Sequence, residues 1–324
     1  MKSEWTDKDV AYLQKHHDTM TADQMARHLK KTYDQVKAKL RRMGLKSLDD
    51  SMTKKNRKWS EFVENNKDEK VSKEIRLNKV TLVPNKNGMA ELVFFGDLHL
   101  GYPTCDIKKA QAMLDWCLAN KAYVIGMGDY MECGITGSVG DVYQQTLNPQ
   151  KQMDEVTEMF APLAKAGLLI GLLQGNHEAR IYKTTSIDVV GVMSKMLGVP
   201  YLGYSCWNLL RVGNQHYTMY STHGAGGSRF KHTKLKAVMD LAAWIHADII
   251  AMGHVHAIVT EEIRQQHIEL RQHKVVESKC YVIETGGYLN WDGSYGQVAN
   301  MPITTIGSPK IKLSGVSKDF HCGL

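Results

Sequence analysis

The sequence contains no apolar run long enough to cross a membrane, although 43% of its 324 residues are hydrophobic. Its most apolar stretch, residues 238–259, is interrupted by Asp240, His246, Asp248 and His254, whereas a membrane-spanning helix needs about 20 predominantly apolar residues. The first 20 residues are polar and lack the apolar core of a secretory signal peptide. We therefore expect a soluble, cytoplasmic protein with no membrane partner.

Closely spaced cysteines are also missing. The six cysteines are far apart in the chain, with no C-x-x-C pair and no spacing typical of a small disulfide-bonded domain. This favours a reduced, intracellular protein over a secreted one, and none of the six lies in a pattern that indicates a catalytic thiol. The sequence has no internal repeat and no low-complexity tract.

Positive charge is concentrated in the first 46 residues. The formal net charge of the chain is +7, and this segment holds 11 Lys or Arg against 6 Asp or Glu, an excess of five. Apolar residues recur at helical spacing between residues 5 and 45, and Thr6, Thr21 and Thr32 stand where N-caps are expected. The pattern predicts three short helices, of which the third is strongly basic and ends at Gly44.

The order of these features resembles Myb/SANT-like helix-turn-helix domains. The resemblance rests on Trp-Thr-x-x-Asp at residues 5–9, Met-Ala-x-x-Leu at residues 25–29 and Thr-x-x-x-Val-x-x-x-Leu-Arg-x-x-Gly-Leu at residues 32–45. It implies that the third helix enters the major groove of DNA, although a single Trp5 in place of several tryptophans implies a minimal, weakly specific module. A solvated basic helix that binds nothing is the alternative. The candidate DNA contacts are Tyr33, Gln35, Lys37, Lys39, Arg41 and Arg42.

The rest of the chain reads as a linker followed by an α/β domain. Residues 47–75 mix charges of both signs with few apolar side chains, which is typical of a linker, and a short helix is expected around residues 59–65. Apolar runs then alternate with helical patterns, which predicts an α/β sheet core. After His256 the composition changes to strands and turns, which we expect to form a second sheet. The helical patterns lie near residues 107–119, 152–166, 187–197 and 232–246.

Five short polar motifs follow apolar runs at which strands are expected to end. Such motifs meet at one edge of a sheet, and a bridged pair of divalent cations needs carboxylate, imidazole and amide ligands from several loops. Asp97 and His99 are two residues apart, so in an extended segment both side chains would leave the same face and bind one ion. His254 and His256 repeat this spacing, and Asp129 has two oxygens with which to bridge both ions. The motifs are Gly96–His99, Gly128–Asp129, Gly175–Glu178, His223–Gly224 and Gly253–His256.

The order of the motifs resembles the calcineurin-like metallophosphoesterase superfamily. Singly, such an aspartate can cap a helix and such a histidine can be structural, but the pattern D-x-H, G-D, G-N-H-[D/E], H, G-H-x-H is filled throughout residues 90–260. The resemblance implies a four-layer α/β/β/α sandwich that binds two divalent metal ions, with manganese expected and iron, zinc or nickel as alternatives. One ion would bind Asp97, His99, Asp129 and His256, and the other Asp129, Asn176, His223 and His254.

The resemblance also implies a hydrolytic mechanism. A metal-bridging hydroxide would attack phosphorus, and His177 would serve the leaving group as an acid. Many relatives pair that histidine with an Asp three residues after the bridging Asp, so the longer Glu132 predicts a displaced dyad or none. Phosphoprotein phosphatases carry arginines where this chain has Cys133 and Gln174, which argues against protein substrates. The candidate substrate-binding residues are Arg180 and Arg229.

Three functions fit these features. The first is a phosphodiesterase or nuclease that a helix-turn-helix domain (1–46) directs to DNA through the linker (47–75), an arrangement that resembles phage or prophage proteins. The second is a phosphatase or cyclic-nucleotide phosphodiesterase for a small molecule, in which the metallophosphoesterase domain (76–324) has the same chemistry and the N-terminal domain serves localisation only. The third is a DNA-binding regulator with an inactive metal domain, which the intact ligand positions disfavour.

Overall fold

The computed structural model describes residues 5–50, 76–136, 138, 142–226, 230–270 and 273–323. The chain divides into two compact units, residues 1–74 and 75–324, and each is described here by itself. The short helix expected around residues 59–65 lies outside the described residues.

The first unit contains the three helices that the sequence predicts, α1 (Asp7–His16), α2 (Ala22–Leu29) and α3 (Tyr33–Arg42), and residues 48–50 are helical as well. Each begins with a capping box, in which the threonine hydroxyl accepts a hydrogen bond from the backbone N–H three residues later. The side chain at that later position accepts one from the threonine N–H in return. The predicted N-caps Thr6, Thr21 and Thr32 are therefore confirmed, and Gly44 follows the third helix with a φ of +70°.

The segment after α3 is part of the same unit. The Asp49 carboxylate accepts a hydrogen bond of 3.0 Å from the Ala22 N–H at the start of α2, and a ring nitrogen of His17 lies 3.0 Å from the Lys46 carbonyl oxygen. The helical unit thus continues past residue 46, the expected boundary, as far as Asp50. Its core is made of Leu13, Ala22, Met25, Ala26, Val36 and Leu40.

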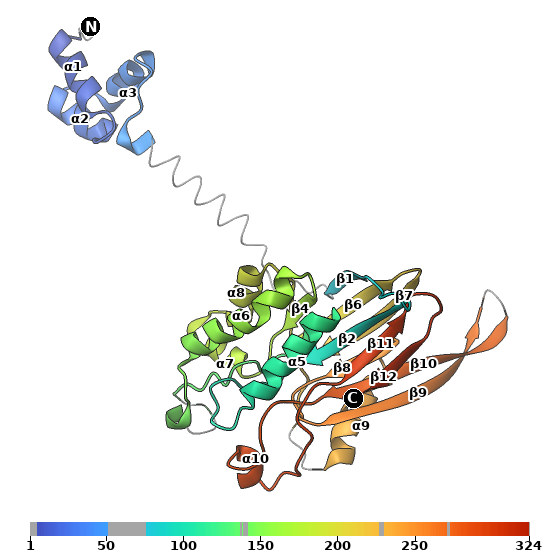
Figure 1. Cartoon of the computed structure of the whole chain (residues 1–324). Helices are drawn as coiled ribbons and strands as arrows, with labels where there is room; N and C mark the ends of the chain where they lie inside the picture. The colour runs from blue at the N-terminus through green and yellow to red at the C-terminus, as the bar shows by residue number, and fades with distance from the viewer. Residues whose placement is uncertain are drawn as a thin grey trace. The chain divides into compact units, whose positions relative to one another are not determined.

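Two six-stranded sheets form the second unit (Figure 1). The first has the order β12-β11-β2-β3-β4-β5, in which β2 to β5 are parallel. The second has the order β1-β6-β7-β8-β10-β9 and mixes parallel with antiparallel pairs. The strands are β1 (Leu77–Leu82), β2 (Met89–Phe95), β3 (Tyr123–Gly126), β4 (Leu169–Leu173), β5 (Tyr201–Gly203), β6 (Ser205–Val212), β7 (Gln215–Thr222), β8 (Ile249–Met252), β9 (Ile258–Glu269), β10 (Lys274–Thr285), β11 (Lys310–Ser314) and β12 (Phe320–Gly323).

Helices cover the outer faces of both sheets. α5, α6 and α8 lie over the first sheet, and α9 packs on β8 and β10 of the second, so the predicted four-layer α/β/β/α sandwich is confirmed. Among the described helices none is long and apolar enough to cross a membrane. The helices of this unit are α5 (Ile107–Asn120), α6 (Pro149–Lys165), α7 (Glu178–Thr185), α8 (Val189–Leu197), α9 (Lys231–Leu241) and α10 (Tyr295–Val298), with one 3₁₀ turn (Val142–Gln144).

The expectation that the segment after His256 forms a second sheet is met only in part. Only β9 and β10 join the second sheet, beside β8, whereas β11 and β12 extend the first sheet next to β2. The reason is burial, because Ile311 and Leu313 of β11 are fully buried and pair with Leu92 and Ala90 of β2. An apolar face of this kind must be buried against a core. As a strand of the first sheet, β11 shares the core that contains Leu92 and Ala90.

The strand register brings the polar motifs together. In the first sheet Phe95, the last residue of β2, pairs with Gly126, the last residue of β3. In the second sheet Thr222 at the end of β7 pairs with Met252 at the end of β8. Each of the five motifs follows one of these ends or the end of β4, as the sequence predicts, so all five lie on one rim of the sandwich.

Candidate metal centre

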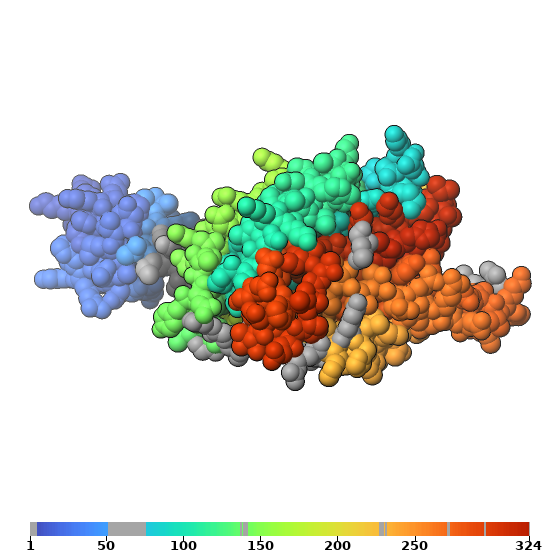
Figure 2. Space-filling view, turned by 60° about the horizontal axis from the view of Figure 1, so that its bottom comes forward, coloured from blue at the N-terminus to red at the C-terminus, as the bar shows by residue number. Residues whose placement is uncertain are grey.

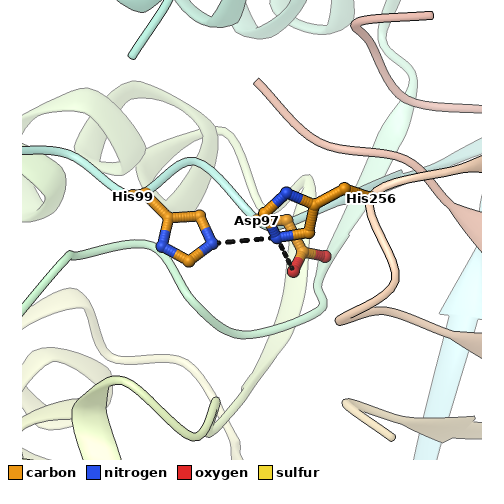
Figure 3. A group of neighbouring side chains, drawn as sticks. All are labelled: Asp97, His99 and His256. Atoms are coloured by element: carbon orange, nitrogen blue, oxygen red, sulfur yellow. Dashed lines mark hydrogen bonds and ion pairs between the residues drawn. The ribbon is translucent and has the colours of Figure 1, made fainter. Parts of the chain in front are cut away.

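The first ligand group consists of Asp97, His99 and His256, which Figure 3 shows pointing toward one another. The Nε2 atoms of the two histidines are 3.0 Å apart, and His256 Nε2 is 3.3 Å from Asp97 Oδ1. Metal–ligand bonds of about 2.1 Å place neighbouring ligand atoms about 3.0–3.4 Å apart in octahedral or tetrahedral sites. The three side chains are therefore spaced as ligands of one metal ion are.

The second ligand group consists of Asp129, His223 and His254. His223 Nε2 lies 3.2 Å from Asp129 Oδ2 and 2.9 Å from the Asn176 Oδ1 atom, so the amide oxygen of Asn176 faces the same space. The other ring nitrogen of His223 donates to the Met127 carbonyl at 2.8 Å. With its Nδ1 proton held in this way, the Nε2 lone pair is directed at the centre.

Asp129 connects the two groups. Its Oδ1 accepts a hydrogen bond of 2.9 Å from the His177 N–H, whereas its buried Oδ2 accepts none. Around Oδ2 stand three imidazole Nε2 atoms, at 3.2 Å for His223, 3.8 Å for His99 and 3.9 Å for His177. His254 Nδ1 is a second buried polar atom with no hydrogen bond. Buried polar atoms without a hydrogen bond are rare, and both belong to residues of the second ligand group.

Five ligand residues adopt left-handed backbone conformations, with φ between +50° and +71°. The expectation that Asp97 and His99 share the face of an extended segment is therefore wrong. Their side chains converge because each residue turns inward where its N–H bonds to the neighbouring loop, at Gly128 for Asp97 and at Asp129 for His99. Such conformations cost about 1–3 kcal/mol each and persist where the surrounding structure enforces them. The five are Asp97, His99, Asp129, His254 and His256.

Two glycines allow the loops to approach this closely. A Cβ atom on Gly175 would lie 2.1 Å from Asp129 Oδ1 and 2.2 Å from the Asp129 backbone nitrogen. On Gly128, which has a φ of +91°, a Cβ atom would lie 2.7 Å from His223 Nδ1. Any side chain at these positions would displace a ligand residue, which explains why glycines stand beside the ligands in the sequence.

Glu178 is a supporting residue that the sequence did not single out. Its buried carboxylate accepts three backbone hydrogen bonds, from Asp129 at 3.1 Å, Met131 at 3.1 Å and Gly175 at 3.0 Å. Burial and the nearby charge of Asp129 raise the pKa of Glu178 to about 7. The carboxylate thus ties the loop after β3 to the loop after β4. The sequence signal that could have identified Glu178 is the acidic fourth position of the pattern G-N-H-[D/E].

The charges of the centre shift the pKa values of its residues. Burial opposes ionisation of Asp129, but His223 and His177 outweigh it and hold the pKa of Asp129 well below its usual value. Burial likewise opposes the cationic form of His223, yet Asp129 raises its pKa to about 10. Burial lowers the pKa of His99 to about 4. A cation bound by His223 would replace a proton, so metal binding is coupled to proton release.

His177, Glu132 and Arg180 form a cluster beside the ligands. His177 Nδ1 is 2.9 Å from the Glu132 backbone carbonyl, to which it donates, and 3.3 Å from the Glu132 carboxylate. That carboxylate is closer to His99 Nδ1, at 3.0 Å, so the histidine–carboxylate dyad is displaced as predicted for the longer side chain. Arg180 Nη2 lies 2.9 Å from His177 Nε2. Arg229 lies outside the described residues.

The candidate DNA contacts on α3 differ in how far they are already engaged. The Tyr33 hydroxyl donates to Asp49 at 3.3 Å, and the Gln35 side chain accepts from the Thr32 N–H in the capping box. Lys37 forms ion pairs with Asp49 and Asp50. Lys39 is half-buried, with its ammonium 5.6 Å from the ring centre of Trp5. Arg41 and Arg42 are exposed.

Comparisons with known proteins give structural neighbours only. No family model and no curated protein matches the sequence. Similar solved structures include a predicted phosphoesterase from Streptococcus pneumoniae (12% identity, TM-score 0.32, 70% of this chain and 84% of that chain) and a Vps29 double mutant from Entamoeba histolytica (13%, 0.32, 72% and 97%). A metallophosphoesterase from Sphaerobacter thermophilus is a third (12%, 0.31, 72% and 87%). Likeness at this level carries no information on activity.

Proposed function

We propose that the chain is a metal-dependent phosphodiesterase that the N-terminal helical unit directs to DNA. The observation that carries the proposal is the position of Asp129 Oδ2, which accepts no hydrogen bond and lies between two ligand groups. Aspartate, histidine and asparagine donors suit manganese, iron, zinc or nickel. With Asp97, His99, Asp129 and His256 around one ion and Asp129, Asn176, His223 and His254 around the other, every donor is within the described residues.

The protein's own residues supply binding and proton transfer. Two divalent cations in the centre would polarise the phosphoryl oxygens and lower the pKa of a bound water. Arg180, whose side chain is 21% exposed, can donate to a phosphoryl oxygen from beside His177. Burial opposes the cationic form of His177, but Asp129 and Glu132 together outweigh burial and raise the pKa of His177. Because Nδ1 donates to the Glu132 carbonyl, the proton for the leaving oxygen would be carried on Nε2.

A substrate comparison tests the proposed chemistry. With manganese, we expect the protein to hydrolyse bis-p-nitrophenyl phosphate faster than p-nitrophenyl phosphate, and to cut DNA under the same conditions. A preference for the monoester would contradict the diesterase proposal. Hydrolysis of neither ester with any of the four metals would favour the regulator with an inactive metal domain.

The His177→Asn variant separates an acid from a residue that only orients the substrate. A DNA alkoxide must be protonated as it leaves, whereas p-nitrophenolate leaves without a proton. We therefore expect DNA cleavage to slow by about 100-fold or more, hydrolysis of bis-p-nitrophenyl phosphate to change only a few-fold, and the metal content to stay the same. The exposed His216 on β7 provides the control variant His216→Asn. Equal losses on both substrates, or loss of metal, would contradict the acid role.

DNA binding by the first unit is the second part of the proposal. It is supported by the basic end of α3, where Arg41 and Arg42 are exposed and able to reach phosphates. Tethering through the linker makes the second contact intramolecular, at an effective concentration on the order of millimolar. The engaged side chains of Tyr33, Gln35 and Lys37 leave Lys39, Arg41 and Arg42 as the proposed contacts.

The Arg41→Gln/Arg42→Gln double variant tests this part. Each lost phosphate contact reduces the slope of log affinity against log salt by about 0.9, so we expect a duplex-binding slope smaller by about 2. Hydrolysis of bis-p-nitrophenyl phosphate should be unchanged. The matched control is Lys8→Gln/Lys15→Gln, which removes two exposed charges from α1. An unchanged slope in the arginine variant, or an equal fall in the control, would contradict DNA binding through α3.

A small-molecule substrate is the second candidate function. It is favoured by a cavity of about 490 Å³ beside the ligands, which is within the size range of small-ligand sites. In this case deletion of residues 1–50 would leave DNA cleavage at moderate salt undiminished, and a mononucleotide or cyclic nucleotide would be a better substrate than DNA.

A further inference from the structure

The cavity beside the ligands has one wall that phosphate chemistry does not require. It touches both ligand groups, through His254 and His256, and also His177 and Arg180. It is also lined by residues of the segment from Leu289 to Thr304, which includes α10. In Figure 2 this segment stands on the near face of the molecule, as an orange-red block next to the yellow-orange α9.

The two walls differ in chemistry. Imidazoles, a guanidinium and the Glu132 carboxylate form the wall at the ligands, whereas the wall formed by the second segment is made largely of apolar side chains: Leu289, Trp291, Val298, Ala299, Met301 and Pro302. Phosphate alone would interact only with the first wall. The second wall fits an apolar, flat group attached to the phosphate, because such a group gains by leaving water and by stacking on an aromatic ring.

The apolar wall is held in place by hydrogen bonds. The Trp291 indole N–H donates to the Met301 carbonyl at 2.7 Å, which joins the two ends of the turn around α10. The Asn290 N–H donates to the Thr104 carbonyl at 2.9 Å, which anchors the segment to the loop before α5. Trp291 is only half-buried. Its ring is therefore both fixed and accessible, as a stacking platform must be.

We propose that this wall binds one unpaired base, and that the base belongs to the nucleotide on the leaving side of the scissile phosphate. We place the base on the leaving side because the cavity is lined by Arg180 and by His177, the proposed acid for the leaving oxygen. A volume of about 490 Å³ is suited to one nucleotide rather than to a base pair with both its strands. The inference rests on the proposed function and names its substrate class: single-stranded or frayed DNA.

A base-deletion experiment tests the proposal with the full chain and manganese. The substrates are a single-stranded oligonucleotide, the same strand with one abasic residue, and the corresponding duplex. Stacking of one base contributes about 1–3 kcal/mol. In the wild-type protein we compare one phosphodiester in two substrates, with a normal or an abasic residue on its leaving side. We expect cleavage to be about tenfold slower when that residue is abasic. Interior sites of the duplex should be cut at least tenfold more slowly than the single strand.

Variants of Trp291 connect this effect to the wall. In Trp291→Leu, cleavage at the normal site should become about tenfold slower, whereas cleavage at the abasic site should not slow further. The difference in rate between normal and abasic sites then disappears. Trp291→Phe should restore it, because phenylalanine keeps an aromatic face while it lacks the N–H donor. The control is Trp244→Leu, at a tryptophan that is 65% exposed and does not line the cavity. Metal content should be the same in all of them.

The outcomes separate this inference from the proposed function. Equal rates at normal and abasic sites in a protein that cuts DNA would overturn the base-binding wall and leave the phosphodiesterase intact. The base-binding wall is also overturned if Trp291→Leu keeps the discrimination of the wild type. If the wild type hydrolyses no phosphodiester with any metal, both proposals fall together.

Discussion

The Asp129→Asn variant is expected to lose phosphodiesterase activity by a factor of about 1000 or more and to bind at most one metal ion per chain. The substitution keeps the size of the side chain and leaves Oδ1 able to accept from the His177 N–H. It removes the negative charge and replaces one carboxylate oxygen by an amide nitrogen. An amide nitrogen does not bind a cation, so the connection between the two ligand groups is lost.

The charge lost from Asp129 has a second effect on the same centre. Of the groups that raise the pKa values of His223 and His177, Asp129 has the largest influence on each. Without it, His177 is less protonated near neutral pH, which weakens the proton donor as well as the metal site. The expected loss is therefore larger than that of any single histidine ligand.

Elemental analysis and hydrolysis of bis-p-nitrophenyl phosphate together measure this result. Asp115→Asn is the matched control, because Asp115 is an exposed aspartate on α5 whose carboxylate accepts from Gln111 at 2.8 Å. It should retain two metal ions and full activity. A fully active Asp129→Asn protein with two ions would show that Asp129 is not the bridge.

The second large effect is expected for Glu178→Gln, a residue that touches neither the proposed metals nor the substrate. Three backbone N–H groups converge on its carboxylate, and a glutamine can offer only one oxygen to them while its NH₂ group faces a donor. Leaving a buried donor unsatisfied costs about 1–3 kcal/mol. With the glutamine oxygen at the position of Oε2, which accepts from Asp129 and Gly175, the Met131 N–H loses its acceptor.

We expect Glu178→Gln to lower the free energy of unfolding by about 1–3 kcal/mol and to weaken metal binding by about 10–100-fold, the range found for residues that support ligands. Excess manganese should restore much of the activity, which separates a positioning role from a catalytic one. Thermal unfolding and a manganese titration of activity measure the two effects.

Glu158→Gln on α6 is the matched control for this variant, since Glu158 is exposed and distant from the motifs in sequence. It should change neither property. If Glu178→Gln matched the control in both unfolding and metal titration, the three backbone hydrogen bonds would have no role in assembling the centre. If activity were lost but could not be restored by manganese, Glu178 would act in the chemical step.

Local features of the sequence were sufficient for much of the fold. The capping threonines predicted the starts of α1, α2 and α3 because a capping box is completed within four residues. Apolar runs predicted the buried strands, since their length and their polar boundaries are local properties. The alternation of these runs with helical patterns predicted the α/β class. The polar motifs after the strands contain the residues that the structure brings together on one rim of the sandwich.

Interactions between distant segments decided the rest. Which sheet receives β11 depends on the apolar edge of β2, more than 200 residues earlier in the chain. The inward turn of Asp97 and His99 depends on hydrogen bonds to the loop after β3, so an extended segment was the wrong local expectation. Lys37 was one of the candidate DNA contacts, and only the tertiary structure shows that it pairs with Asp49 and Asp50.

The sequence alone therefore determined which side chains can bind metal and where the strands that carry them end, because residue type and apolar periodicity are local. Only the tertiary structure decided how those side chains face one another, that Glu178 ties two loops together, and that Trp291 lines the same cavity as His177. These relations join residues up to 159 positions apart along the chain, as Asp97 and His256 are, and burial and hydrogen bonding between such segments are set only when the chain is folded.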